Sequence, residues 1–201
     1  SAMANAGQSC IGAERVYVVE SVADEFIEII TKMAKKIEVG KDYGPATMPS
    51  QLKVIQSHLD DAKASGAKFL VGGNDSVKGA FVEPVIMVDV PENSTAMTEE
   101  TFGPVAPIAT FSNLEEVIQM ANSTPYGLAG FIFTSDLNSA LQIGLRLEVG
   151  MVGINNLTIA TAEAPFGGVK SSGFGREGGA EGIEEFLITK YINARMGRVK
   201  L

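Results

Sequence analysis

The 201-residue chain is predicted to adopt an α/β fold, in which a doubly wound, mostly parallel sheet is flanked by helices. The first observation is that short β-branched runs alternate with amphipathic segments of about 10 to 16 residues, the order that builds parallel crossovers. The second is a continuously apolar run from 128 to 134, typical of a strand buried on both faces of a sheet. The third is a hydrophobic fraction of 45%, which allows a substantial core.

Hydrophobic periodicity and capping residues indicate the elements in chain order. We expect strands at 15–19, 68–71, 81–90, 105–111, 128–134 and 151–155. We expect helices over 21–40, 50–66, 114–121, 137–145 and, shorter, 181–186. Pro84 cannot donate a hydrogen bond to a neighbouring strand, so the run at 81–90 is expected to be kinked or to lie at an edge. The alternating segment 187–193 is expected to form a terminal strand.

Charge and composition argue against several classes of partner. The formal net charge is −8 and no basic stripe is present, which argues against binding to nucleic acid or to an anionic membrane. No run of about 18 apolar residues offers a membrane span. A single cysteine cannot form an internal disulfide, which is consistent with a reducing cytoplasm. We also expect no metal site. Ser1-Ala2-Met3 lacks the pattern of a signal peptide, so we expect the sequence to begin within a larger protein.

The segment Asn5-Ala6-Gly7-Gln8-Ser9-Cys10 places the only cysteine of the chain on a glycine turn just before the strand at 15–19. Backbone amides of such a loop can point at the group that the sulfur attacks, and the thiolate is the nucleophilic form of cysteine. The alternative is that Cys10 is a small buried apolar residue, which is the commoner role of a lone cysteine. The residues around it favour the nucleophile.

Three segments, spread over residues 5 to about 191, occur in the order found in the aldehyde dehydrogenase superfamily, which the chain resembles. The first is the Asn-x-Gly-Gln-x-Cys motif at 5–10, followed by an Arg-x-x-Val strand that begins at Arg15. The second is Glu100-Thr101-Phe102-Gly103-Pro104, which is similar to the family's cofactor-contacting Glu-x-Phe-Gly-Pro motif. The third lies at 165–173 and is similar to the family's late glycine-rich loop.

This resemblance implies oxidation of an aldehyde to a carboxylic acid with NAD or NADP. Cys10 is expected to attack the aldehyde, and the resulting thiohemiacetal becomes a thioester that water cleaves. The family stabilises the oxyanion with the backbone N–H of the nucleophile and an asparagine side chain from another domain. That asparagine, the general-base glutamate and a cofactor-contacting lysine precede the nucleophile in the family and are absent from this sequence. We therefore expect this chain alone to be inactive.

The resemblance also implies a division of the chain and roles for further residues. We expect a catalytic domain at 1–186, a C-terminal oligomerisation strand and tail at 187–201, and no N-terminal dinucleotide-binding domain. Glu100 is expected to bind the nicotinamide ribose hydroxyls, because an ionised carboxylate accepts both hydroxyl protons. Phe102 is expected to pack near the same end of the cofactor. The substrate pocket is expected to be lined by Ser9, Ile11, Thr161 and Phe166.

The substrate is indicated less directly. The tail from Phe174 to Tyr191 is similar to the succinate-semialdehyde dehydrogenase branch of the family, whose pocket binds a carboxylate. Members of that branch often carry an arginine directly before the motif asparagine, as a bidentate partner of the substrate carboxylate, and this chain has Ala4 there. Thr161 could still hydrogen-bond such a group, so succinate semialdehyde is one candidate substrate.

Three other features receive structural roles. Residues 173–178 match the pattern G-x-G-x-x-G, but they follow no buried strand and precede no acid about 20 residues on, so we expect a structural loop beside the substrate cavity. Asn5 is expected to brace its own loop, since short amides satisfy turn backbones. His58, the only histidine, is expected to lie on the surface of a helix, away from Cys10.

Two other functions remain open on the residues alone. Cys10 could serve a cysteine hydrolase or acyl transferase without nicotinamide, or the terminal strand could make the chain a non-enzymatic oligomerisation module. Neither alternative explains the Glu-x-Phe motif or the late glycine-rich loop. Each face of 187–193 carries apolar residues, and exposed edges of that kind are usually covered. We expect this strand to be an intersubunit arm, although it could also fold back on its own sheet.

The resemblance also indicates the partners of the complete protein. We expect a small-molecule aldehyde, the protein's own N-terminal dinucleotide-binding domain, and assembly into a homodimer or homotetramer.

Overall fold

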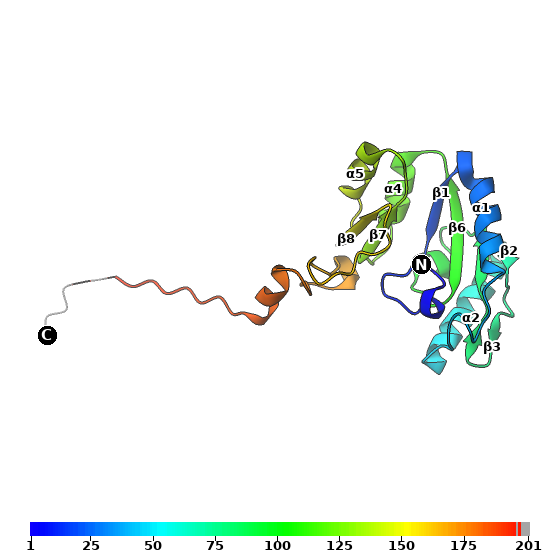
Figure 1. The fold of residues 1–201 in the computed structure, drawn as a ribbon, viewed down its shortest axis with the longest axis horizontal. Helices are drawn as coiled ribbons and strands as arrows, with labels where there is room; N and C mark the ends of the chain where they lie inside the picture. Colours follow the sequence, from blue (N-terminus) through cyan, green and yellow to red (C-terminus); the bar gives the residue numbers. More distant parts are fainter. Residues whose placement is uncertain (196, 198–201) are drawn as a thin grey trace.

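The computed structural model describes residues 1–195 and residue 197, and the largest of its sheets, the central sheet, has four strands (Figure 1). The strands lie in the order β1 (Val16–Val19), β6 (Val105–Phe111), β5 (Val85–Val88) and β2 (Lys68–Val71). β6 runs parallel to both β1 and β5, whereas β2 is antiparallel to β5. The mostly parallel sheet expected from the sequence is therefore confirmed.

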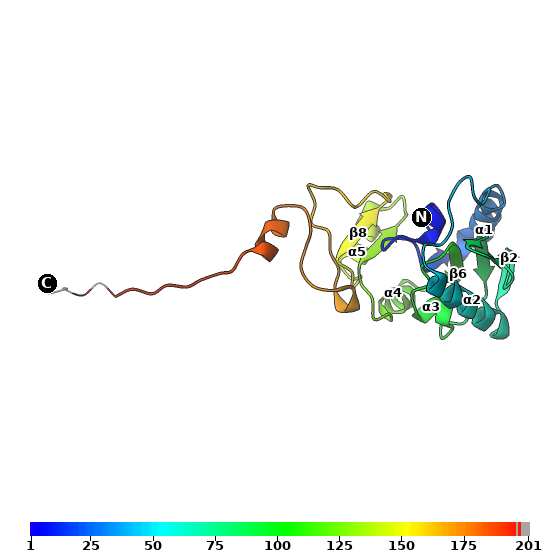
Figure 2. The same ribbon diagram turned by 90° about the horizontal axis from the view of Figure 1, so that it is seen from below.

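Two helices cover opposite faces of this sheet. α1 (Glu20–Ala34) and α2 (Pro49–Ala64) lie on either side of β6 in Figure 2. The side chains of β5 alternate between the two faces: Met87 packs in a core cluster with the α2 residue Leu59, whereas Ile86 packs in a cluster on the α1 side. All three of these side chains are fully buried, so the sheet is doubly wound at this point.

A second parallel pair follows in the chain, formed by β7 (Ala129–Ile132) and β8 (Met151–Ile154). α4 (Leu114–Asn122) precedes this pair, and α5 (Leu137–Gly144) connects its two strands. Both helices are capped as expected, because the side chains of Asn113 and Asp136 accept hydrogen bonds from backbone N–H groups of the first turn. The remaining short elements are β3 (Val77–Lys78), β4 (Phe81–Val82), α3 (Thr95–Thr98) and the 3-10 turns η1 (Ala4–Gly7), η2 (Lys170–Ser172) and η3 (Glu181–Phe186).

The structure differs from the expectation at 81–90. This run is divided into β4, which pairs with β3 in a hairpin, and β5, and Pro84 lies at the break. Pro84 therefore produces the expected kink, but β5 is an interior strand rather than an edge. A second difference is that β7 and β8 form a sheet of their own instead of extending the central one.

The expected terminal strand at 187–193 is not a strand within this single chain. The segment leads away from the sheets in both views, and it pairs with no strand in the described residues (Figures 1 and 2). Ile188 is 95% and Tyr191 84% exposed, so the apolar side chains have no cover here. A strand needs a hydrogen-bonding neighbour, and none of the three sheets in the described residues supplies one to this segment. Of the predicted tail 187–201, residues 196 and 198–201 lie outside the described residues.

Within the described part of the chain, no helix is long and apolar enough to cross a membrane.

Candidate active site

The segment that carries Cys10 and the segment that carries Glu100 meet at one edge of the central sheet. The first leads into β1 and the second into β6, and these two strands are parallel neighbours, so their amino ends lie at the same edge. The backbones touch: a Cβ atom added to Gly7 would lie 2.0 Å from the carbonyl oxygen of Gly103. Gly7 has a φ of +73°, which glycine adopts without steric cost. The fold thus brings together two motifs that are about 90 positions apart in the sequence.

Cys10 lies near the tip of a tight turn. The N–H of Gly12 donates to the carbonyl of Ser9 at 2.9 Å, which closes the turn around Cys10 and Ile11. The Cys10 side chain is exposed, so the alternative of a buried apolar cysteine is wrong. Its backbone N–H donates to no acceptor within the described residues. Both the sulfur and this N–H are therefore available to a bound molecule.

Two amide side chains hold this loop. Asn5 donates from Nδ2 to the carbonyl of Gln8 at 3.0 Å, as a loop-bracing residue should. Gln8 donates from Nε2 to the carbonyl of Asn5 at 3.0 Å, and its Oε1 accepts from the N–H of Thr47 at 2.8 Å. Gln8 thus ties the nucleophile loop to the segment before α2. The sequence contains Gln8 as a motif letter, but this second attachment depends on a contact 39 positions away.

Glu14 is a site residue that the sequence analysis missed. Its two carboxylate oxygens accept hydrogen bonds from the N–H groups of Thr101 and Phe102, each at 3.0 Å. Burial raises the pKa of Glu14, the two backbone hydrogen bonds oppose this rise, and the neighbouring charge of Glu100 adds to it. In the sequence Glu14 is a single acid before an arginine and gives no sign of a partner 87 positions away.

The Glu-x-Phe motif presents its first residue to solvent and buries its second. The Glu100 carboxylate is exposed and has no hydrogen-bonding partner within the described residues, whereas Thr101 is 1% exposed. Phe102 is half-buried and has a φ of +48°, an uncommon conformation for a residue with a side chain. His58 was expected on the surface, and this was wrong. It is 2% exposed, with Nδ1 3.0 Å from Thr101 Oγ1, because α2 packs this side chain inward against the motif.

This geometry can be compared with that of known proteins. A profile of the aldehyde dehydrogenase family matches residues 1–192. The chain belongs to the aldehyde dehydrogenase family. The resemblance inferred from the three motifs is therefore confirmed.

Individual relatives agree with this family assignment. The chain is 42% identical over 194 residues to glutarate-semialdehyde dehydrogenase of Pseudomonas putida, covering 94% of this chain and 40% of that protein. It is 40% identical over 195 residues to the NADP(+) succinate-semialdehyde dehydrogenase GabD of Escherichia coli K12, with the same coverage. The crystal structure of an aldehyde dehydrogenase from Brucella melitensis biovar abortus 2308 aligns with a TM-score of 0.88 at 42% identity, over 94% of this chain and 40% of that one. The chain thus spans about two fifths of the length of these relatives.

The late glycine-rich loop of this aldehyde dehydrogenase chain folds back on itself. Phe166 and Glu177 exchange two backbone hydrogen bonds of 2.7 Å, and Arg176 donates to the carbonyl of Gly168 at 2.9 Å. The match to G-x-G-x-x-G therefore lies in a hairpin-like loop, as expected, and not between a strand and a helix. In both views the N-terminal segment lies between the central sheet and the β7–β8 pair that precedes this loop (Figures 1 and 2).

The four expected pocket residues differ in their surroundings. Ser9 and Ile11 flank Cys10 and are half-buried, Phe166 is half-buried in the glycine-rich loop, and Thr161 is exposed. No hydrogen bond joins Thr161 or Phe166 to the nucleophile loop within the described part of the chain. Their role as pocket walls stays a prediction.

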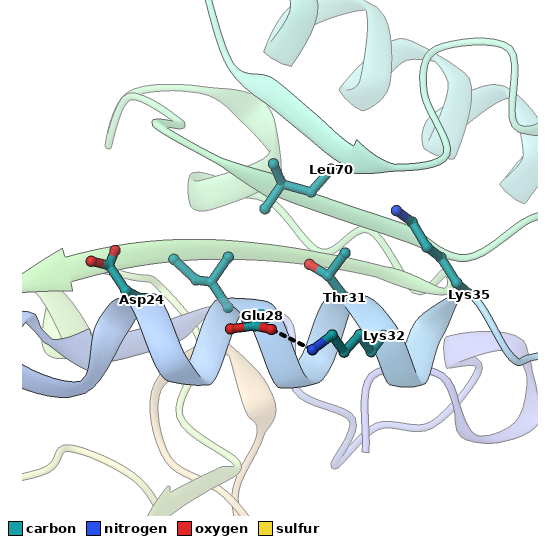
Figure 3. A pocket seen from close by; sticks show the side chains of 7 residues that line it. Asp24, Glu28, Thr31, Lys32, Lys35 and Leu70 are labelled. Carbon is teal, nitrogen blue, oxygen red and sulfur yellow. Dashed lines mark hydrogen bonds and ion pairs between the residues drawn. The ribbon is translucent and has the colours of Figure 1, made fainter.

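Two hollows on the described surface lie away from Cys10. One is a groove of about 450 Å³ between α1 and β2, where Thr31 and Leu70 face each other and Glu28 pairs with Lys32 (Figure 3). The other, also about 450 Å³, lies along α2. Neither is lined by Cys10, Glu100 or Phe102. The arrangement of the two motif loops, rather than a hollow, therefore identifies the candidate site.

Proposed function

We propose that this chain is the catalytic portion of an NAD- or NADP-dependent aldehyde dehydrogenase with Cys10 as its nucleophile. The observation that carries this proposal is the contact between the exposed cysteine turn and the Glu-x-Phe motif, in a chain of this family. In the proposed reaction the Cys10 sulfur forms a bond to the aldehyde carbon. The Cys10 N–H donates to the developing oxyanion. The thiohemiacetal so formed would lose a hydride to NAD(P)+ and become a thioester. Water would then cleave this thioester and release the acid and the free thiol.

The residues of the chain fit one end of a nicotinamide cofactor. The exposed carboxylate of Glu100 is free to accept hydrogen bonds from two ribose hydroxyls, because an ionised carboxylate has only acceptors. Phe102 follows it in a fixed, left-handed backbone conformation and supplies an apolar surface. The bound cofactor supplies the hydride acceptor for the oxidation. GabD, named for NADP(+), is consistent with such a cofactor, and the choice between NAD and NADP is left to experiment.

The proposed substrates are semialdehydes that carry a carboxylate. Two of the relatives are named for glutarate semialdehyde and succinate semialdehyde. Ala4 stands where an arginine was expected for a carboxylate pocket, and the side chains of Arg15 and Arg176 are engaged by backbone carbonyls. The carboxylate would then be held by hydroxyl and amide groups, with Thr161 as one donor. Recognition of this kind is expected to favour a carboxylated aldehyde over a neutral one by about 10- to 100-fold, because a hydrogen bond to a charged group contributes about 1.5–3 kcal/mol.

We also propose two properties of the assembly. The general base, the oxyanion asparagine and most of the cofactor site belong to an N-terminal domain, so the 201-residue chain alone has negligible activity. The apolar side chains of 187–193, exposed here, are covered by the catalytic sheet of another subunit in a homodimer or homotetramer. Deleting 187–201 from the complete enzyme and measuring its mass by light scattering tests the arm, since an unchanged oligomer would contradict it.

The function is tested in the complete enzyme with Cys10→Ser. We expect NAD(P)H formation to fall on the order of 10³-fold or more, because serine keeps the size of the side chain but removes the thiolate. Wild-type activity in this variant would contradict Cys10 as the nucleophile. The wild-type enzyme is assayed in parallel with succinate semialdehyde, glutarate semialdehyde and propanal. A kcat/KM that is highest for propanal would contradict the proposed substrate class while leaving the reaction type intact.

A further inference from the structure

Thr101, the middle residue of the Glu-x-Phe motif, is held through each of its polar groups. Its N–H donates to Glu14, its carbonyl accepts from Nε2 of Gln51 at 2.6 Å, and its hydroxyl lies 3.0 Å from Nδ1 of His58. The three partners come from the nucleophile loop and from α2. Because Thr101 is 1% exposed, water does not replace any of these bonds. The motif is therefore anchored at its centre, and Glu100 and Phe102 project from this anchor.

His58 contacts an acid as well as Thr101. Its Nε2 lies 3.5 Å from the carboxylate of Glu99, and its Nδ1 shares a hydrogen bond of 3.0 Å with the Thr101 hydroxyl. The bond fixes the Thr101 side chain but leaves the backbone N–H groups of the motif to another partner.

Glu14 is that partner, and its chemistry matches the task. A carboxylate offers an acceptor oxygen to each of two N–H groups, and here Oε2 takes Thr101 and Oε1 takes Phe102. No other side chain of residues 5–14 hydrogen-bonds to residues 99–104 within the described structure. Two charged groups influence Glu14: Glu100 raises its pKa and Arg15 lowers it. A half-buried acid next to another acid is an unfavourable placement, which the two N–H groups offset.

We propose that Glu14 is a positioning residue that sets Glu100 and Phe102 relative to Cys10. It acts through the backbone at 101–102 and touches neither substrate nor cofactor. Glu14 stands four residues after Cys10, just beyond the turn at 9–12, so its carboxylate connects the nucleophile loop to the cofactor-contacting loop. The Phe102 backbone needs such a connection, because a left-handed φ of +48° is unfavourable for phenylalanine unless its surroundings hold it. This inference rests on the proposed function for its catalytic consequence.

The test compares Glu14→Gln and Glu14→Asp with the wild type in the complete enzyme. Glutamine keeps the shape but presents an NH2 group to one of the two N–H donors. Aspartate keeps the charge but is one methylene too short to reach both. We expect each variant to raise the KM for NAD(P)+ about tenfold, with the KM for the aldehyde little changed. We also expect amide hydrogen exchange at Thr101 and Phe102 to accelerate about tenfold, without a general acceleration elsewhere.

Glu115→Gln is the matched control, because Glu115 also accepts two hydrogen bonds, from the guanidinium of Arg146, but lies on α4. This control variant should leave the KM for NAD(P)+ and the amide exchange at Thr101 and Phe102 unchanged. Unchanged exchange at Thr101 and Phe102 in Glu14→Gln would overturn the proposal, as would a general loss of protection with both KM values raised together. If the wild-type enzyme oxidises no aldehyde, the proposed function fails separately. The role of Glu14 is then tested by amide exchange and by fluorescence titration with NADPH. Wild-type affinity for NADPH in both Glu14 variants would overturn the proposal.

Discussion

Gly7→Ala is expected to be among the most damaging small substitutions in the nucleophile loop. The new methyl group would lie 2.0 Å from the carbonyl oxygen of Gly103 and 2.7 Å from the nitrogen of Pro104. These are backbone atoms and do not rotate away as a side chain would. The buried side chain of Ile55 opposes a retreat of Gly103, since its Cδ1 would lie 2.7 Å from a Cβ atom added to Gly103. One of the two loops must therefore move.

The expected loss of unfolding free energy has two parts. A φ of +73° costs an alanine about 1–2 kcal/mol relative to glycine. The steric conflict adds about 1–3 kcal/mol, the range for overpacking in a closely packed site. We expect a total of about 2–5 kcal/mol. Gly79→Ala isolates the first part, because Gly79 has a similar φ of +64° but no heavy atom within 4 Å of an added Cβ.

Urea denaturation of the 201-residue chain, followed by circular dichroism, measures both variants. The unfolding free energy of Gly7→Ala should be lower than that of Gly79→Ala by the steric contribution alone, about 1–3 kcal/mol. In the complete enzyme Gly7→Ala should also lower kcat, because the displaced loop carries Cys10, whereas Gly79→Ala should not. Equal stability of the two variants would refute the reasoning, since it would mean that the approach of Gly7 to Gly103 is not close enough to matter.

Two further predictions concern side chains outside the proposed site. Thr31→Val should raise the unfolding free energy by about 1 kcal/mol in the same denaturation assay, because Thr31 Oγ1 is buried without a hydrogen-bonding partner among the described residues. Thr95→Val, which removes a hydroxyl bonded to Asp61, should instead lower it. Tyr17→Phe should remove a loss of stability at high pH. Burial raises the pKa of Tyr17 from 10.0 to about 12, so its favourable contribution is complete below pH 10 and is lost as the pH rises towards 12. The wild-type advantage over Tyr17→Phe should therefore shrink in that window, and a constant difference would contradict the assignment.

The helices and strands could be predicted from the sequence because their signals are local. The caps at Asn113 and Asp136 and the β-branched runs at 68–71 and 105–111 all lie within the elements they specify. The order of the strands has no such signal. β6 lies between β1 and β5, although some 85 residues separate β1 from β6 in the chain. Parallel neighbours need crossovers of a dozen or more residues, and many orders satisfy that condition equally well.

The candidate site could be proposed from the sequence where a short motif points to chemistry. Cys10, Glu100 and Phe102 follow from motifs that agree with the family assignment, and their roles stay predictions. His58 and Glu14 were not predictable, because each is defined by a partner that is distant in sequence. A histidine in the middle of a helix can face solvent or the core, and the choice depends on how α2 rotates against residues 99–101.

The position of Glu14 can be understood from the strand order. Open α/β sheets usually bind ligands beyond the carboxyl ends of their strands, where the loops are free to vary. Here the two motif loops lie at the amino ends of β1 and β6. A side chain close to the start of one strand can therefore reach the backbone that precedes the other. Glu14 is two residues before β1, and the N–H groups that it holds lie three and four residues before β6. A shift of either strand by one residue would point a different side chain at those N–H groups, since successive side chains face opposite sides of a strand. The contact of Glu14 with residues 101 and 102 thus depends on the same parallel register of β1 and β6 that builds the core.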